Sequence, residues 1–211
     1  MTVMLIALFV SCELSAQINI SGTINQNTAV SSVSQPNCSD CSPTCKDTIT
    51  VDDASSFQVG DRALIIQMKG ASISVANTSS GGQISDIANA GNYEFFIVDS
   101  VDNTGNLIFP VYGLVKQYDA TGQVQVIRIP NYGNATVTVT GTLTAPTWQE
   151  STGVGGVVAL IAKKLVLNAD IDVIGKGFKG NTMNTNGTPD NCSVSPTSAY
   201  TLASTASQSY T

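Results

Sequence analysis

Apolar and polar residues alternate with a period of two along the middle of the chain. The alternation is clear at 48–51, 62–68 and 93–101. These runs are rich in β-branched and aromatic residues and are bounded by Gly, Asp and Asn, which is typical of β-strands with one buried face. No helical periodicity extends beyond about two turns, so the pattern predicts an all-β protein.

Tight turns separate these runs. The segments 102–106, Asp-Asn-Thr-Gly-Asn, and 118–122, Tyr-Asp-Ala-Thr-Gly, supply the Asn and Gly residues that hairpin turns need. Further strands are expected at 107–109 and 123–130. Short strands joined by such turns predict a small antiparallel β-barrel or sandwich over 47–130.

The pattern changes after Pro130. Short apolar runs, split by Gly and Asn, follow one another quickly at 135–139, 141–145, 155–162 and 165–173. Such runs suit successive rungs of a parallel β-helix, whose tight corners need these residues. We therefore expect an antiparallel β domain at 47–130, followed by the first rungs of a parallel β-helix at 131–192.

The first sixteen residues have the form of a secretory signal peptide. An apolar run from Val3 to Val10 is followed by small residues and ends at Ala16, before Gln17. A lipid anchor on Cys12 and a buried N-terminal strand are the alternatives. About eight apolar residues are too few for a transmembrane span, which needs about twenty. We expect a secreted or outer-surface protein that is not transmembrane.

Four cysteines lie beyond this leader. Residues 17–46 are polar, and we interpret them as an extended lead-in segment that disulfides hold in place. An even number of cysteines in an exported chain favours two disulfides over a metal site, with three connectivities open. One bridge would close a loop of about 150 residues and stabilise the fold in the chain-entropy model. The candidates are Cys38, Cys41, Cys45 and Cys192.

Composition narrows the classes of function. Only 11% of the residues are charged and the net charge is −6, so no basic patch is available for nucleic acid. Histidine is absent, which removes the commonest general base and every Ser-His or Cys-His nucleophile. We expect a protein that is not an enzyme and needs no cofactor, with calcium as the one candidate ligand ion.

Two acidic residues are the main candidates for chemistry. Asp170 and Asp172 alternate along one expected strand, so both carboxylates project from one face, about 7 Å apart. With Asn168 they could bind calcium, or they could form the acid/base pair of a polysaccharide-cleaving β-helix. The alternative is a solvated strand face opposite Ile171 and Val173.

Aromatic residues offer a second candidate site. The only tryptophan and four of the tyrosines could stack on sugar rings, and packing in the core or at a sheet edge is the alternative for most of them. These residues are Trp148, Tyr93, Tyr112, Tyr118 and Tyr132.

The stretch 51–71 resembles the start of large secreted proteins of the Bacteroidetes, with the sequence VDDASSFQVGDRALIIQMKGA. Such proteins often end in a gliding-motility-associated or type IX secretion sorting domain. The similarity continues through 90–94 and 126–130 and is strongest at 167–180, LNADIDVIGKGFKG. It implies a cell-surface adhesin or matrix component, and it carries over no catalytic residues.

The same resemblance implies two acceptors for O-glycosylation. Residues 47–49, Asp-Thr-Ile, and 99–101, Asp-Ser-Val, match the Asp-Ser/Thr-apolar pattern used in that phylum, which points to Thr48 and Ser100. A strand with an exposed Asp is the alternative interpretation of each. The polar tail 193–211 carries no sorting domain, so we expect a fragment of a longer protein or another export route.

Together these observations favour an exported surface adhesin or structural module. Contacts to glycans or to cell-surface components would come from loops such as the Ser-, Gly- and Asn-rich segment 70–92. Two alternatives stay open. One is a β-helical polysaccharide lyase or hydrolase with paired Asp residues, and the other is a ligand-free N-terminal cap of a longer β-helix.

Overall fold

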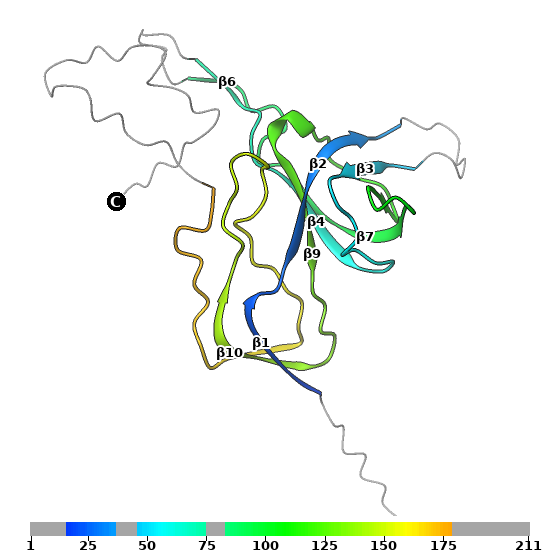
Figure 1. Cartoon of the computed structure of the whole chain (residues 1–211). Coiled ribbons are helices and arrows are strands. Elements are labelled where there is room, and N and C mark those ends of the chain that lie inside the picture. Colours follow the sequence, from blue (N-terminus) through cyan, green and yellow to red (C-terminus); the bar gives the residue numbers. More distant parts are fainter. Residues whose placement is uncertain (1–15, 37–45, 75–82, 179–211) are drawn as a thin grey trace, which may run out of the picture.

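The structure is a computed structural model that describes residues 16–36, 46–74 and 83–178. Within these ranges the strands form a closed barrel, a parallel sheet and a small hairpin (Figure 1), and the one helical element there is a 3₁₀ turn, η1 (Ala120–Gly122). In the described part of the chain, no helix has the length and apolar character to cross a membrane. The prediction of an all-β fold with an antiparallel and a parallel part is confirmed.

The barrel comprises residues 26–129 and closes in the order β2-β3-β8-β7-β4-β9, with every neighbouring pair antiparallel. Alternate side chains point inward, and Ile49, Ile65 and Val98 of its core are all fully buried. Closure leaves none of these six strands as a sheet edge. The strands are β2 (Gln26–Ser34), β3 (Thr48–Val51), β4 (Arg62–Gln67), β7 (Tyr93–Val101), β8 (Leu107–Pro110) and β9 (Val124–Ile129).

Two barrel strands, β4 and β9, are apolar on both faces. Ile65 of β4 lies in the barrel core, whereas its neighbour Leu64 belongs to a second cluster with Ile127 of β9. Val157 and Ala159, from the other part of the molecule, pack against this second cluster. Because both faces are covered, these strands have nearly continuous apolar runs in place of simple alternation.

The parallel unit comprises residues 16–25 and 130–178. Its sheet has the order β1-β10-β11, formed by β1 (Gln17–Thr23), β10 (Thr136–Thr144) and β11 (Lys164–Leu167). These strands are successive rungs, where a rung is one turn of a β-helix.

A spacing of 28 positions relates most paired residues of the second and third rungs, and the bridge of Asn131 to Ile161 spans 30. Thr136 pairs with Lys164, and a separate parallel bridge joins Leu143 to Ile171. Both partners are 28 positions apart, which is the regular repeat expected when a chain winds through equivalent turns.

Inward-facing side chains line up from rung to rung. Ile20 of β1 is level with Val139 of β10, which is level with Leu167 of β11. Ile20 and Val139 are 7% and 0% exposed, but Leu167 is 58% exposed. Within the described residues, the third rung therefore presents an exposed apolar end.

The barrel is inserted between the first and second rungs. Gln17 pairs with Thr136 although 119 positions separate them, because the chain forms the whole barrel between β1 and β10. The incoming strand β2 and the outgoing strand β9 are paired, with Gln26 opposite Arg128. Figure 1 shows β1 and β10 side by side at the bottom of the view, with the barrel strands above them.

Two buried amide side chains join the barrel to the parallel unit. Gln125 donates from Nε2 to the Gly155 carbonyl oxygen at 3.0 Å and accepts the Gly155 N–H at 2.9 Å. Asn25 makes the same pair of bonds with Ala159, at 2.7 and 2.9 Å. These bonds satisfy backbone groups that would be costly to bury unpaired.

A glycine is required at this junction. Gly155 has a φ of +109°, and a Cβ there would lie 2.6 Å from the Thr147 carbonyl oxygen. Any larger residue would push the 155–159 segment away from the barrel, because backbone atoms cannot move aside as a side chain can.

The segment 17–46 differs from the expected lead-in. Its described residues form β1 and β2, so the antiparallel unit begins at Gln26 and not at Asp47, and the parallel unit has its first rung before the barrel. The run 155–162 was expected to be a strand, but only Ile161 makes an isolated bridge there. Val157 and Ala159 pack on the outside of β4 and β9, whereas Val158, Leu160 and Ala162 pack against the core of the parallel unit.

Candidate functional site

Several residues singled out in the sequence lie outside the described ranges. They are the leader up to residue 15, the tail 193–211 and all four disulfide candidates, namely Cys38, Cys41, Cys45 and Cys192. The disulfides and the leader therefore stay predictions. Part of the segment 70–92 is described, and it contains the hairpin of β5 (Ser72–Ile73) and β6 (Ile84–Asp86).

The two expected glycosylation acceptors lie on barrel strands. Thr48 begins β3 and Ser100 lies near the end of β7, and both are half-buried. The neighbouring Asp99 forms an ion pair with Lys46, at 2.7 Å between Oδ2 and Nζ. Modification of Thr48 and Ser100 stays a prediction.

The candidate calcium residues lie on the surface of the third rung. Asn168, Asp170 and Asp172 are all exposed, and residues 167–171 line an open depression of about 420 Å³. One oxygen of Asp172 accepts the N–H of Ile174 at 2.9 Å. Within the described residues no group of three or more His, Cys, Asp or Glu could hold a metal ion. Calcium binding here stays a prediction.

A barrel loop, residues 111–117, is held in place by two carboxylates. Glu94 of β7 accepts the N–H groups of Val115 and Lys116, at 2.9 and 3.0 Å. Asp47 accepts the N–H of Leu114 at 2.6 Å. Three consecutive backbone donors are thus bound by charged acceptors, which form stronger hydrogen bonds than neutral ones.

Tyr118 completes the support of this loop. Its hydroxyl donates to Glu94 at 3.0 Å, and only 8% of the residue is exposed. Burial, together with the hydrogen bond to Glu94 and the negative charge of that carboxylate, raises the pKa of Tyr118 well above its usual value. The hydroxyl therefore stays protonated and donates to Glu94 across the physiological pH range.

The 111–117 loop presents large side chains to solvent. Tyr112 is 92% exposed and Val115 is 90% exposed. The ammonium group of Lys116 lies 5.3 Å from the centre of the Tyr93 ring, and Tyr93 makes an edge-to-face contact with Phe95. The loop and the start of β7 thus form an exposed aromatic surface on the barrel.

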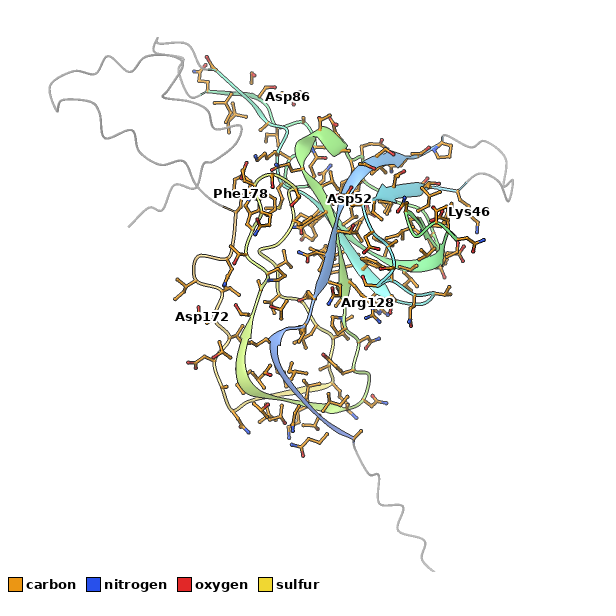
Figure 2. All side chains as sticks on the ribbon, viewed as in Figure 1. Lys46, Asp52, Asp86, Arg128, Asp172 and Phe178 are labelled. Atoms are coloured by element: carbon orange, nitrogen blue, oxygen red, sulfur yellow. The ribbon has the colours of Figure 1, made fainter. Side chains whose placement is uncertain are left out.

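A concavity of about 380 Å³ lies beside Tyr112. It is lined by Lys46, Asp47 and residues 110–114, so that one aromatic side chain, one ammonium group and one carboxylate border the same space. Figure 2 shows Lys46 on the barrel and Asp172 on the opposite side of the molecule, so this concavity is separate from the candidate calcium residues.

The aromatic residues of the sequence analysis fall into two groups. Tyr93 and Tyr112 are exposed, whereas Trp148 and Tyr118 are buried, and Tyr132 packs at the edge of the core of the parallel unit. The indole N–H of Trp148 donates to Glu150 at 3.0 Å. A sugar-stacking surface formed from all five residues is therefore excluded by their positions.

The chain matches no protein-family model and none of the curated proteins. It is similar to a solved structure, the Gp54 tailspike of Acinetobacter baumannii bacteriophage AP22 in complex with A. baumannii capsular saccharide, with 14% identity and a TM-score of 0.34. The similarity covers 73% of this chain and 24% of the tailspike chain, so this chain spans about a quarter of that protein.

Proposed function

We propose that this chain is a non-enzymatic module of an exported surface protein, in which the barrel is a head carried on the first rungs of a β-helical stalk. The exposed apolar end of the third rung is the observation that carries the proposal. Leu165, Leu167 and Ile171 are 40%, 58% and 44% exposed, although their partners in the second rung are fully buried. A further rung at the same repeat would cover them and remove apolar surface from water.

The insertion of the barrel supports its role as a head. Because β2 and β9 leave and rejoin the parallel unit side by side, the barrel interrupts the winding of the stalk without displacing its rungs. A head attached in this way stands beside the stalk, where its loops are open to partners.

Two observations support a role without catalysis. The sequence contains no histidine. Asp170 and Asp172 lie on an open surface, and Asp172 already accepts a backbone N–H, so the pair is not enclosed as a catalytic pair would be. Digestion of polysaccharides by the protein, lost in the Asp170→Asn/Asp172→Asn variant, would favour the lyase or hydrolase alternative.

The stalk is tested by a polar substitution at its open end. We expect Leu167→Ser to lower the free energy of unfolding by about 2–4 kcal/mol, because a covering rung would bury this side chain. The matched control is Lys164→Ser on the outward face of the same strand, for which we expect a change within about 0.5 kcal/mol. Equal, small effects in urea unfolding would contradict a covering rung.

The surface location is tested on intact cells that produce the protein. We expect a membrane-impermeant biotin reagent to label it without lysis. Labelling only after lysis would contradict export, whatever the behaviour of the stalk variants.

A further inference from the structure

The concavity beside Tyr112 has the volume of a small-ligand site. Its volume of about 380 Å³ lies within the range of about 300–1,000 Å³ that is usual for such sites. Tyr112 borders it and is 92% exposed as a residue, so its side chain is accessible to a ligand. Binding sites of this kind combine an apolar surface with a few polar groups that fix orientation.

The loop that carries Tyr112 is arranged before any ligand arrives. Asp47 and Glu94 bind the N–H groups of residues 114–116, and Leu114 packs against the barrel core. Gly113 has a φ of +74°, and a Cβ there would lie 3.0 Å from an Asp47 carboxylate oxygen. A loop already fixed in this way loses little conformational entropy when it binds, which favours affinity.

We propose that this concavity binds a neutral saccharide, with Tyr112 as the stacking residue and with Lys46 and Asp47 as hydrogen-bonding partners. The C–H groups on one face of a sugar ring pack against an aromatic ring, and its hydroxyls both donate and accept hydrogen bonds. An ammonium donor and a carboxylate acceptor beside one tyrosine match both requirements. The proposal rests on the proposed function, since it names the ligand class of the barrel head.

The charges around the concavity favour a neutral sugar over an acidic one. Among the described residues that line it, Lys46 is the one cation, and its ammonium is already paired with Asp99 at 2.7 Å. Asp47 is the one carboxylate among them. A uronic or sialic acid would meet the Asp47 carboxylate and an ammonium shared with Asp99, and like charges at short range repel.

The same charges argue against a protein partner at this position. The centres of protein–protein interfaces are depleted in charged residues, because each buried charge must be desolvated. Here Lys46 and Asp47 line the depression itself. Sugar hydroxyls can bond to both groups and leave them partly solvated.

The test is binding of the full chain to a printed array of neutral and acidic oligosaccharides, followed by calorimetric titration of the best neutral binder. We expect Tyr112→Ala to weaken that affinity at least tenfold. Tyr112→Phe keeps the ring and is expected to bind within about threefold of the natural chain. Phe95→Ala is the matched control, since Phe95 is an exposed aromatic residue, 63% exposed, that does not line the concavity.

Glu94 is a positioning residue, and its variant separates loop geometry from direct contact. Glu94→Gln keeps the size of the side chain but weakens its bonds to Val115 and Lys116. We expect several-fold weaker binding of the same saccharide, with a more unfavourable binding entropy, because the loop must then be ordered on binding. A purely structural role would lower thermal stability without this change in entropy.

Three results would overturn the proposal: no binding of neutral saccharides by a chain shown to be folded, binding of acidic sugars alone, or equal affinity of the natural chain and Tyr112→Ala. Binding to cells that survives periodate oxidation of their sugars and is lost in Tyr112→Ala would assign the site to a protein partner instead. Any of these results, obtained together with the expected loss of stability in Leu167→Ser, would overturn saccharide binding and leave the stalk proposal standing. Saccharide binding as expected, together with no loss of stability in Leu167→Ser, would overturn the stalk proposal alone.

Discussion

The barrel and the parallel unit are built from similar alternating strands, but they bury their apolar residues by different means. In the barrel, closure of six strands covers the core, and Ile49 and Val98 are fully buried. In the parallel unit, each rung needs a neighbouring rung to cover its end, and Leu167 on the third rung is 58% exposed. A closed sheet has no unpaired edge strand, whereas the apolar residues of a rung are buried only when a neighbouring rung covers them.

The largest effect is expected in the barrel core. Ile65→Ala should lower the free energy of unfolding by about 2–5 kcal/mol, because Ile65 is fully buried among strands that close on one another and cannot collapse around a cavity. Urea unfolding monitored by circular dichroism measures this effect. Val59→Ala, at a barrel position that is 74% exposed, is the control and should change stability by less than about 0.5 kcal/mol. Similar effects of the two variants would contradict a closed core.

An effect of about 2–4 kcal/mol is expected at the junction of the two parts. Gln125→Leu removes both bonds to Gly155 and leaves a buried N–H and a buried carbonyl without partners. It should also uncouple the two parts, so that the parallel unit unfolds before the barrel. The fluorescence of Trp148 follows unfolding of the parallel unit, because Trp148 is the only tryptophan in the sequence and lies in that unit. Its fluorescence should change at lower urea concentration than circular dichroism does.

The control for the junction is Gln58→Leu, at an exposed position in the barrel. Its fluorescence and circular dichroism transitions should coincide, as they should in the natural chain. Coincident transitions in Gln125→Leu as well would mean that Asn25 alone is enough to couple the two parts.

The smallest effect expected is a loss of stability in acid that arises at one turn of the barrel. Asp102 accepts hydrogen bonds from the hydroxyl and N–H of Thr104 and from the N–H groups of Asn106 and Leu107. The Thr104 hydroxyl, followed by the backbone N–H groups, lowers the pKa of Asp102 to about 2. Because the pKa is lowered in the folded state, the stabilisation is present above about pH 4 and is lost as the pH falls toward 2.

Thr104→Val checks this assignment, since it removes the hydroxyl that has the largest effect. The pKa of the Asp102 carboxyl, followed by NMR titration, should rise toward its ordinary value, and the variant should lose less stability between pH 4 and pH 2. An unchanged titration would show that the backbone N–H groups are sufficient.

The alternation of the sequence predicted the central barrel strands well, because each has one face in the core. The expected runs 48–51, 62–68 and 93–101 match β3, β4 and β7 closely. β2 was missed because its small Ser, Thr and Ala residues resemble a polar linker, and it becomes a strand through pairing with β9 and β3. The run 155–162 lacks regular strand pairing although it alternates, because Val157 and Ala159 contact the barrel while Val158 and Leu160 pack in the parallel unit.

The site was only partly predictable. Tyr93 and Tyr112 were among the aromatic candidates, but no local signal separates them from the buried Tyr118. The position of Tyr112 depends on the long-range bonds of Asp47 and Glu94 to the 111–117 loop, 67 and 21 positions away in the chain for Leu114 and Val115. Pairings at that distance along the chain cannot be deduced from residue spacing.

The insertion of the barrel imposes an order on folding. β1 cannot pair with β10 until the chain has been made as far as Thr136, and direct closure would enclose 119 positions. A barrel that folds first brings Gln26 beside Arg128, which leaves only residues 24–25 and 130–135 between the two rungs. Shortening the loop to this extent lowers the entropic free-energy cost of closing it by about 2 kcal/mol. A barrel that forms first would thus make the pairing of the first two rungs of the parallel unit a local event.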